Sequence, residues 1–269
     1  DEIAAACAAP PDCVWYTEAP TEPLAPTLAR YVAADEHTAR AHQDLAQWAA
    51  QNLPPAPADA APRVDLVRPA DTAADIAATL LYPVTAWPFR ALYEMARGWS
   101  AARRAEVIDV ALQSRSARDE LLAGFRGGLY AYDFATDVGA FRDLHRHRRC
   151  QKFRQPYAGG LGYETPPLIE RCGAAETYHD AMRSAFQTLR ALPAPGADYL
   201  LPFGARTRYL FKMDFAEAHY IARLRSGVKG HFSYRQVAWD MKCAMEQLEP
   251  ELGRLMEAPP PWEEDPLRR

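Results

Sequence analysis

The sequence lacks the features that would place the protein in a membrane or in an oxidising compartment. No apolar run approaches the about 18 residues that a membrane-spanning helix requires, and the first residues do not have the pattern of a signal peptide. The five cysteines are odd in number and scattered along the chain, which argues against a disulfide framework and against a paired zinc motif. These absences lead us to expect a cytoplasmic protein without membrane contacts.

The common nucleotide-binding and nucleophile motifs are also missing. The sequence contains no Gly-x-Gly-x-x-Gly after a predicted strand, no P-loop and no Gly-x-Ser-x-Gly elbow. The formal net charge of −4 provides no overall positive field for a nucleic acid, so any anion site must be local. With 49% apolar and 25% charged residues, the 269-residue chain has the composition of an ordinary globular protein.

Helical patterns dominate the chain, with a few strands in its second half. We expect helices over 27–52, 72–81, 87–99, 101–114, 117–123, 166–172, 175–192, 215–225 and 233–256, and a further helix after residue 137. Strands are predicted over 129–135 and 206–213, with shorter extended segments at 13–16, 64–67 and 151–157. The pattern indicates a helix-rich α+β fold with a small mixed sheet, rather than the regular alternation of a doubly wound sheet.

The sequence divides into three predicted regions. Residues 1–63 should comprise an N-terminal arm, a helical segment and a linker, in which four prolines between Leu53 and Arg63 interrupt the helical pattern. Residues 64–256 should form the main domain. Residues 257–269 should form a polar, proline-rich tail.

The strongest functional signal is a basic cluster at the end of the helix predicted after residue 137. Four arginines and two histidines occur within nine residues, 142–150, after an apolar face of Val138, Phe141 and Leu144. Arginine presents a planar fork to phosphate or carboxylate, and neighbouring histidines add donors that titrate near neutral pH. The cluster is typical of an anion site, although the helix dipole alone also favours cations at a helix C-terminus.

A second polar cluster, residues 223–236, follows the helix predicted to end at Arg225. Arg225, Arg235 and Gln236 are its candidate substrate-binding residues, and Gly230 permits a close approach of the backbone to a ligand. The cluster suits the second half of an anion pocket that faces the first. The alternative interpretation is charge pairing between the end of this helix and acidic helices nearby.

Other candidate sites also have a structural explanation. His145, His147 and Cys150 lack a matching second pair, and the adjacent arginines would repel a cation, so we expect no metal site. The same arginines would lower the pKa of a Cys150 thiol and make it reactive, but a small buried side chain is the preferred interpretation. The aromatic segment 130–134 could stack on a flat ring, although aromatic strands more often belong to the core.

Over roughly residues 75–250 the sequence resembles the flavin-dependent thymidylate synthase family. The resemblance rests on Arg146-His147-Arg148, on the aromatic segment 130–134 that precedes it, on Tyr199-Leu200-Leu201-Pro202 and on Leu224-Arg225. The segments 139–144 and 230–235 are similar to a divergent branch of long, duplicated members. The chain would then correspond to one half of such a protein.

The resemblance implies an α/β-type fold, a homotetramer and FAD bound at subunit interfaces. The chemistry of the family reduces flavin with NADPH and moves a one-carbon unit from methylenetetrahydrofolate to the pyrimidine nucleotide dUMP. By this resemblance Arg146, His147 and Arg148 are expected to bind flavin, and Arg225 the anionic substrate; no catalytic residue is assigned. The expected partners are a small-molecule substrate, such as a nucleotide, and further copies or a homologous half, but no nucleic acid.

Several positions depart from the family pattern and leave more than one function open. The Ser and Arg that follow the family's Arg-His-Arg correspond to Pro156 and Ala158, and polar residues of its penultimate helix correspond to Asp214, Ala216 and Tyr220. Missing polar partners would leave a bound phosphate underpaired. The first hypothesis is a divergent flavin-dependent enzyme that transfers a one-carbon unit or electrons to a ring substrate. The alternatives are a non-catalytic relative acting as an oligomeric scaffold or regulatory subunit, and an unrelated helical domain that binds an acidic metabolite or protein.

Overall fold

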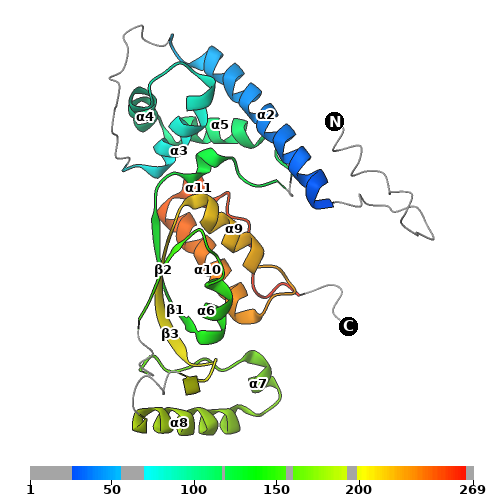
Figure 1. Cartoon of the computed structure of the whole chain (residues 1–269), viewed down its shortest axis with the longest axis vertical. Coiled ribbons are helices and arrows are strands. Elements are labelled where there is room, and N and C mark those ends of the chain that lie inside the picture. The colour runs from blue at the N-terminus through cyan, green and yellow to red at the C-terminus, as the bar shows by residue number, and fades with distance from the viewer. Residues whose placement is uncertain (1–25, 56–69, 117–118, 156–159, 193–198, 265–269) are drawn as a thin grey trace, which may run out of the picture. The chain divides into compact units, whose positions relative to one another are not determined.

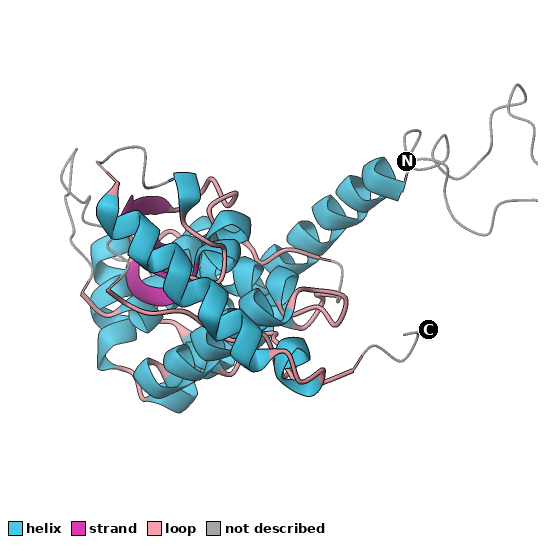
Figure 2. Cartoon of the chain, turned by 90° about the horizontal axis from the view of Figure 1, so that it is seen from below, coloured by secondary structure: helices cyan, strands magenta, loops and turns pink. Residues whose placement is uncertain are grey.

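The computed structural model describes residues 26–55, 70–116, 119–155, 160–192 and 199–264. Helix accounts for most of these residues, and the strands form one small sheet (Figure 2), so the predicted helix-rich α+β class is confirmed. The chain divides into two compact units, residues 1–128 and 129–269. The extended segments expected at 13–16 and 64–67, and the boundary expected at residue 64, lie outside the described residues.

The first unit is helical in its described part. Its elements are α2 (Pro26–Asn52), α3 (Thr72–Leu81), α4 (Phe89–Gly98) and α5 (Ala101–Leu112), with 3-10 segments η1 (Tyr82–Val84) and η2 (Ala123–Arg126). Asp71 caps α3 by accepting the Ala74 N–H, and Ser100 caps α5 by accepting the Arg103 N–H, as their residue types predict. The largest fully buried side chains of this unit are Leu45, Ile76, Leu81, Leu92, Ile108 and Phe125.

The helix expected over 117–123 is wrong in its described part. Residues 119–122 are not helical, and only η2 follows. The Asp119 carboxylate accepts a hydrogen bond from the Ser116 N–H at 2.8 Å. Such local side-chain bonds give the backbone an alternative to helical pairing.

The second unit contains the sheet. Its elements are β1 (Tyr130–Asp137), α6 (Val138–Leu144), β2 (Gln151–Arg154), α7 (Pro167–Arg171), α8 (Ala175–Ala191), β3 (Arg206–Met213), α9 (Phe215–Arg225), α10 (Phe232–Leu248) and α11 (Pro250–Gly253). The strand order is β1-β3-β2, and β3 runs antiparallel to both neighbours. The expected mixed sheet is therefore corrected to an antiparallel one, because β3 lies between the two strands that run in the same direction and keeps them from pairing.

Strand β3 carries the core of this unit. Its residues alternate between buried and more exposed positions, with Thr207, Tyr209, Phe211 and Met213 buried, as the period of two predicts. Side chains of α6, α9 and α10 complete the same apolar cluster, and these helices lie along one face of the sheet (Figure 1). Phe134 of β1 belongs to the cluster with Tyr132 packed against it, which favours the core interpretation of the aromatic strand.

The single helix expected over 233–256 is corrected to two helices. Helix α10 ends at Leu248, and α11 begins at Pro250. Proline has no N–H to continue the helical pattern and disfavours helical geometry in the residue before it. Glu249 accordingly has φ −136° and ψ 85°, outside the helical region.

Candidate functional site

Helix α6 positions the basic cluster. Asp137 caps the helix by accepting the Ala140 N–H at 2.8 Å, and its other carboxylate oxygen accepts a hydrogen bond from the Ser233 hydroxyl of α10. Val138 and Leu144 are buried, as the predicted apolar face requires. The helix ends at Leu144, and the turn that follows sets the direction of each basic side chain before β2 begins.

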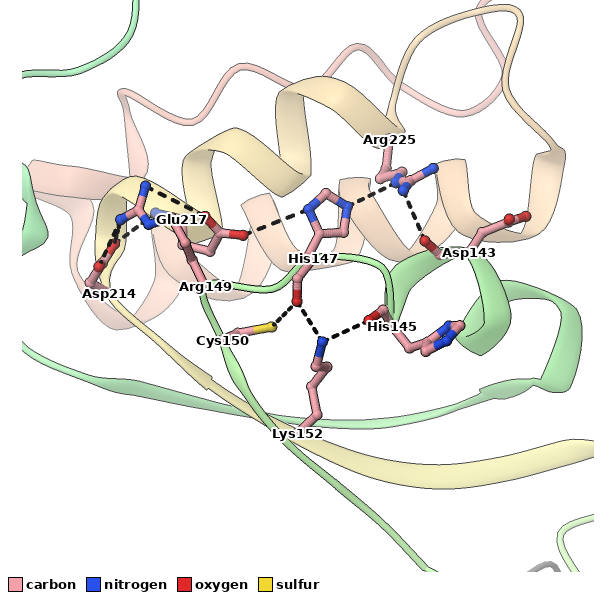
Figure 3. Close-up of polar contacts among 9 residues, drawn as sticks. All are labelled: Asp143, His145, His147, Arg149, Cys150, Lys152, Asp214, Glu217 and Arg225. Atoms are coloured by element: carbon pink, nitrogen blue, oxygen red, sulfur yellow. Dashed lines mark hydrogen bonds and ion pairs between the residues drawn. The ribbon is translucent and has the colours of Figure 1, made fainter.

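His147 is the centre of a buried polar network (Figure 3). Only 6% of the residue is exposed, and its Nε2 accepts a hydrogen bond of 2.9 Å from Nε of Arg225. Arginine stays protonated and only donates, so Nε2 must be the unprotonated nitrogen and Nδ1 must carry the ring proton. Nδ1 faces Oε1 of Glu217 at 3.6 Å. The geometry therefore fixes the tautomer of this imidazole.

Arg225, at the end of α9, connects the two clusters predicted from the sequence. Besides binding His147, it donates from Nη2 to the Asp143 carbonyl oxygen at 2.8 Å, and its Cζ lies 5.6 Å from the centre of the Tyr234 ring. No carboxylate pairs with Arg225 within the described part of the chain. Its charge is thus available to an anion, and the structure brings the Arg-His-Arg and Leu-Arg segments together.

The acidic residues at the start of α9 pair with a different arginine. The Asp214 carboxylate caps α9 by accepting the Glu217 N–H at 2.8 Å, and it also accepts a hydrogen bond of 3.0 Å from Arg149. Glu217 is 3% exposed and lies 3.6 Å from both Arg149 and His147. These two carboxylates balance the positive charge of Arg149, so this charge is already paired within the protein.

The turn between α6 and β2 is held by side chains that donate to its backbone carbonyl oxygens. Lys152 donates from Nζ to the carbonyl oxygens of His145 and His147, both at 2.7 Å. The Cys150 thiol donates to the same His147 oxygen at 3.2 Å. Burial raises the pKa of the Cys150 thiol, despite the opposing charge of Lys152. This supports the interpretation of Cys150 as a small buried side chain rather than a nucleophile.

Arg146 and Arg148 point to solvent on either side of His147. The Arg146 side chain is 64% exposed and lies 3.6 Å from the Asp143 carboxylate, a pair too exposed to hold it firmly. Arg148 is exposed and forms no hydrogen bond or ion pair within the described residues. The two guanidinium groups are therefore accessible to a ligand, whereas the His147 ring is not.

Arg235 and Gln236 do not join this network. Arg235 is 7% exposed and donates to the carbonyl oxygens of Ser226, Pro260 and Glu263 at 2.8–3.3 Å, which ties the end of the chain to α10. Gln236 is exposed and donates to the Asp240 carboxylate at 2.8 Å. Their assignment to substrate binding stays a prediction.

Two residues of the network, Glu217 and Lys152, were not predicted from the sequence. The available signal for Glu217 was the spacing Asp214-x-x-Glu217, but this pattern is typical of a helix N-terminus and does not predict a partner distant in sequence. Lys152 lies on an alternating strand, where a lysine is normally solvated. Both residues gain their role from the turn at 145–150, whose path the sequence does not reveal.

The described residues contain neither a metal-binding cluster nor a helix suited to a membrane. No three His, Cys, Asp or Glu side chains in the described ranges gather closely enough to hold a metal ion. No described helix has both the length and the apolar character that a membrane crossing would need.

The segment that carries this site is similar to proteins of a described family. Residues 128–251 match the family model described as thymidylate synthase complementing protein. A UPF0159 protein of Chlamydia muridarum is 30% identical over 179 residues, which cover 65% of this chain and 34% of that protein. A UPF0159 protein of Thermoplasma acidophilum is 33% identical over 47% of this chain and 26% of its own length.

A further relative carries a functional name. A flavin-dependent thymidylate synthase of Sulfolobus acidocaldarius is 30% identical over 123 residues, which cover 42% of this chain and 47% of that protein. The chain spans about a third or less of the length of the UPF0159 relatives it matches. The matched segment contains β1, the Arg-His-Arg turn, β3, α9 and α10, and its similarity is to the thymidylate synthase complementing protein family.

Proposed function

We propose that the protein is a divergent flavin-dependent enzyme that transfers a one-carbon unit or electrons to a ring-shaped substrate such as a pyrimidine nucleotide. The observation that carries this proposal is the 2.9 Å hydrogen bond between His147 and Arg225, which joins the two family motifs in one buried network. The similarity to the Sulfolobus flavin-dependent thymidylate synthase supports the flavin. NADPH and methylenetetrahydrofolate are the proposed co-substrates.

The residues of the basic turn fit a flavin dinucleotide in part. Arg146 and Arg148 are exposed and offer guanidinium forks of the kind that bind the oxygens of a pyrophosphate. His147 has both ring nitrogens directed at protein groups, so its role toward a cofactor is to hold the turn that carries the two arginines. A bound flavin would supply the redox chemistry, and the chain would supply orientation and charge.

Arg225 is the proposed contact for the anionic substrate. Its guanidinium uses Nε and Nη2 within the protein, and Nη1 donates no hydrogen bond within the described residues. The two hydrogen bonds fix the plane of the group, so little side-chain entropy remains to be lost on binding. A phosphate or an anionic ring oxygen is a suitable partner for this fork.

The visible absorption spectrum tests the flavin assignment. Purified protein is incubated with excess FAD, desalted and compared with Arg148→Ala treated in the same way. We expect the parent protein to retain flavin colour and Arg148→Ala to lose it. The matched control is Arg183→Ala on α8, whose side chain is 63% exposed and, among the described residues, pairs with Asp180 alone. Equal flavin occupancy in all three proteins would show that Arg148 does not bind the cofactor.

A second candidate function is a non-catalytic relative that forms an oligomeric scaffold or regulatory subunit. The observation that favours it is the start of α9, where Asp214 and Glu217 pair with Arg149 inside the protein. A site occupied by its own ion pairs needs no ligand. This function predicts a protein that stays colourless after incubation with FAD but elutes as an oligomer, such as a tetramer, in size-exclusion chromatography with light scattering.

A further inference from the structure

A pocket of about 300 Å³ lies in the second unit, between α6 and the segment that leads into β3. Val138, Phe141 and Arg142 of α6, together with its C-cap residue His145, form one wall, and Leu201 and Phe203 contribute to the other. Residues at positions i, i+3, i+4 and i+7 lie on one side of a helix, so these four side chains line the pocket together.

The two walls are fixed to each other at the start of α6. The Val138 N–H donates to the Ala205 carbonyl oxygen at 2.9 Å, and the Gly139 N–H donates to the Phe203 carbonyl oxygen at 3.1 Å. These N–H groups belong to the first helical turn, where backbone N–H groups have no acceptor within the helix. The pocket is therefore formed by two backbone segments that hydrogen bonds hold in register, which is the pre-formed geometry typical of small-molecule sites.

Arg142 gives the pocket a positive charge without a protein acceptor. Its Cζ lies 4.9 Å from the centre of the Phe203 ring, and the guanidinium forms no hydrogen bond or ion pair in the described part of the chain. The stacking contact with Phe203 holds the planar group at the pocket while its N–H donors stay available.

His145 adds a second polar group to the same wall. Its Nδ1 lies 2.5 Å from the Arg142 carbonyl oxygen, which can only accept, so Nδ1 carries a proton. Nε2 is left without a protein partner among the described residues. Figure 3 shows the His145 ring directed away from His147, so the pocket uses a different face of α6 from the His147–Arg225 network.

We propose that this pocket binds a small aromatic or heteroaromatic ring that carries an anionic group, either a carboxylate or a phosphate. Phe141, Leu201 and Phe203 would contact the ring, and Arg142 would bind the anion with His145 beside it. The volume is at the lower end of small-molecule pockets, which suits one or two fused rings. The proposal uses residues outside the Arg-His-Arg turn and does not depend on bound flavin.

The test measures binding of 1-naphthyl phosphate to flavin-free protein by isothermal titration calorimetry. Neutral 1-naphthol and inorganic phosphate serve as half-probes, each lacking one of the two recognised features. We expect 1-naphthyl phosphate to bind at least about ten-fold more tightly than either, because a hydrogen bond to a charged group is worth more than the about 1.4 kcal/mol of a ten-fold change. Arg142→Gln should weaken binding of 1-naphthyl phosphate by about ten-fold or more.

Two further variants separate this pocket from the basic turn. Leu201→Trp should fill the pocket and abolish binding of 1-naphthyl phosphate, whereas Arg148→Gln should leave it unchanged. Circular dichroism confirms that each variant is folded before the titration. The proposal is overturned if Arg142→Gln binds as well as the parent protein, if 1-naphthol binds as tightly as its phosphate, or if Arg148→Gln loses binding as Arg142→Gln does. The last result would place the ligand at the Arg-His-Arg turn.

Discussion

Glu217→Gln is the substitution that most directly tests the buried network around His147. The two carboxylate oxygens of Glu217 face two donors, His147 Nδ1 and Arg149 Nη1, each at 3.6 Å. Glutamine has the same shape but only one acceptor oxygen, because its other terminal atom is an NH₂ donor. One of the two donors would therefore face another donor in a site that is 3% exposed.

The expected magnitude follows from which interactions are lost. Arg149 is 42% exposed and keeps Asp214 as a partner, so the loss of its contact with Glu217 is screened and small. His147 is buried, and the amide would replace the carboxylate that faces its Nδ1 at 3.6 Å; an uncompensated buried polar group costs about 1–3 kcal/mol. We expect Glu217→Gln to lower the free energy of unfolding of the second unit by about 2 kcal/mol.

Hydrogen exchange followed by mass spectrometry measures this free energy in the second unit alone, from peptides of β3 and α9. The matched control is Glu246→Gln on α10, where the Glu246 side chain is 41% exposed and accepts from Lys242 at 2.7 Å. The introduced amide would retain one acceptor oxygen for Lys242, and an exposed pair four residues apart contributes about 0.5 kcal/mol or less. Equal exchange in the two variants would show that Glu217 does not stabilise the buried network around His147.

Three further predictions concern burial. Burial lowers the pKa of His37 below its ordinary 6.5; the unfolded chain then binds more protons, so the stability of the first unit should fall as pH drops through 6.5, and calorimetry should find a smaller loss in His37→Gln. Alkylation by iodoacetamide at pH 8 should modify exposed Cys172 well before buried Cys150, whose pKa is raised, and equal rates would contradict the burial of Cys150. Phe211→Ala should destabilise the second unit by about 3–5 kcal/mol in denaturant titrations, and a loss below about 1 kcal/mol would place Phe211 outside the core.

Local signals in the sequence predicted much of the fold. The strand predicted over 206–213 is β3, and the face of Val138 and Leu144 predicted how α6 packs. These signals succeed because each depends only on the period of one element and on one buried side. The mixed sheet was wrong because strand direction depends on how the chain returns through α7 and α8, which no local pattern encodes. The single helix expected over 233–256 was wrong because Pro250 cannot continue α10 and instead begins α11.

The candidate site was predictable as a set of residue types but not as a set of contacts. The Arg-His-Arg segment and Arg225 were identified together from the sequence, and the structure joins them through His147. The sequence did not predict that His147 is buried whereas Arg146 and Arg148 are exposed, because adjacent residues of a turn can point into the protein or out of it. Arg235 was expected to bind an anion because it lies in a polar cluster. In the structure it is buried and donates to the backbone carbonyl oxygens of Ser226, Pro260 and Glu263.

The strand order β1-β3-β2 also constrains when the sheet can form during synthesis. β1 and β2 pair only with β3 among the described strands, and β3 begins at Arg206, after α7 and α8. A ribosome therefore produces β1 and β2 before β3. Until β3 is made, the backbone N–H and C=O groups on the pairing edges of β1 and β2 lack this partner. Pairings between distant segments close late, since loop-closure entropy must be overcome first. The pairing edges of β1 and β2 in the nascent second unit thus stay open to misassociation until β3 emerges.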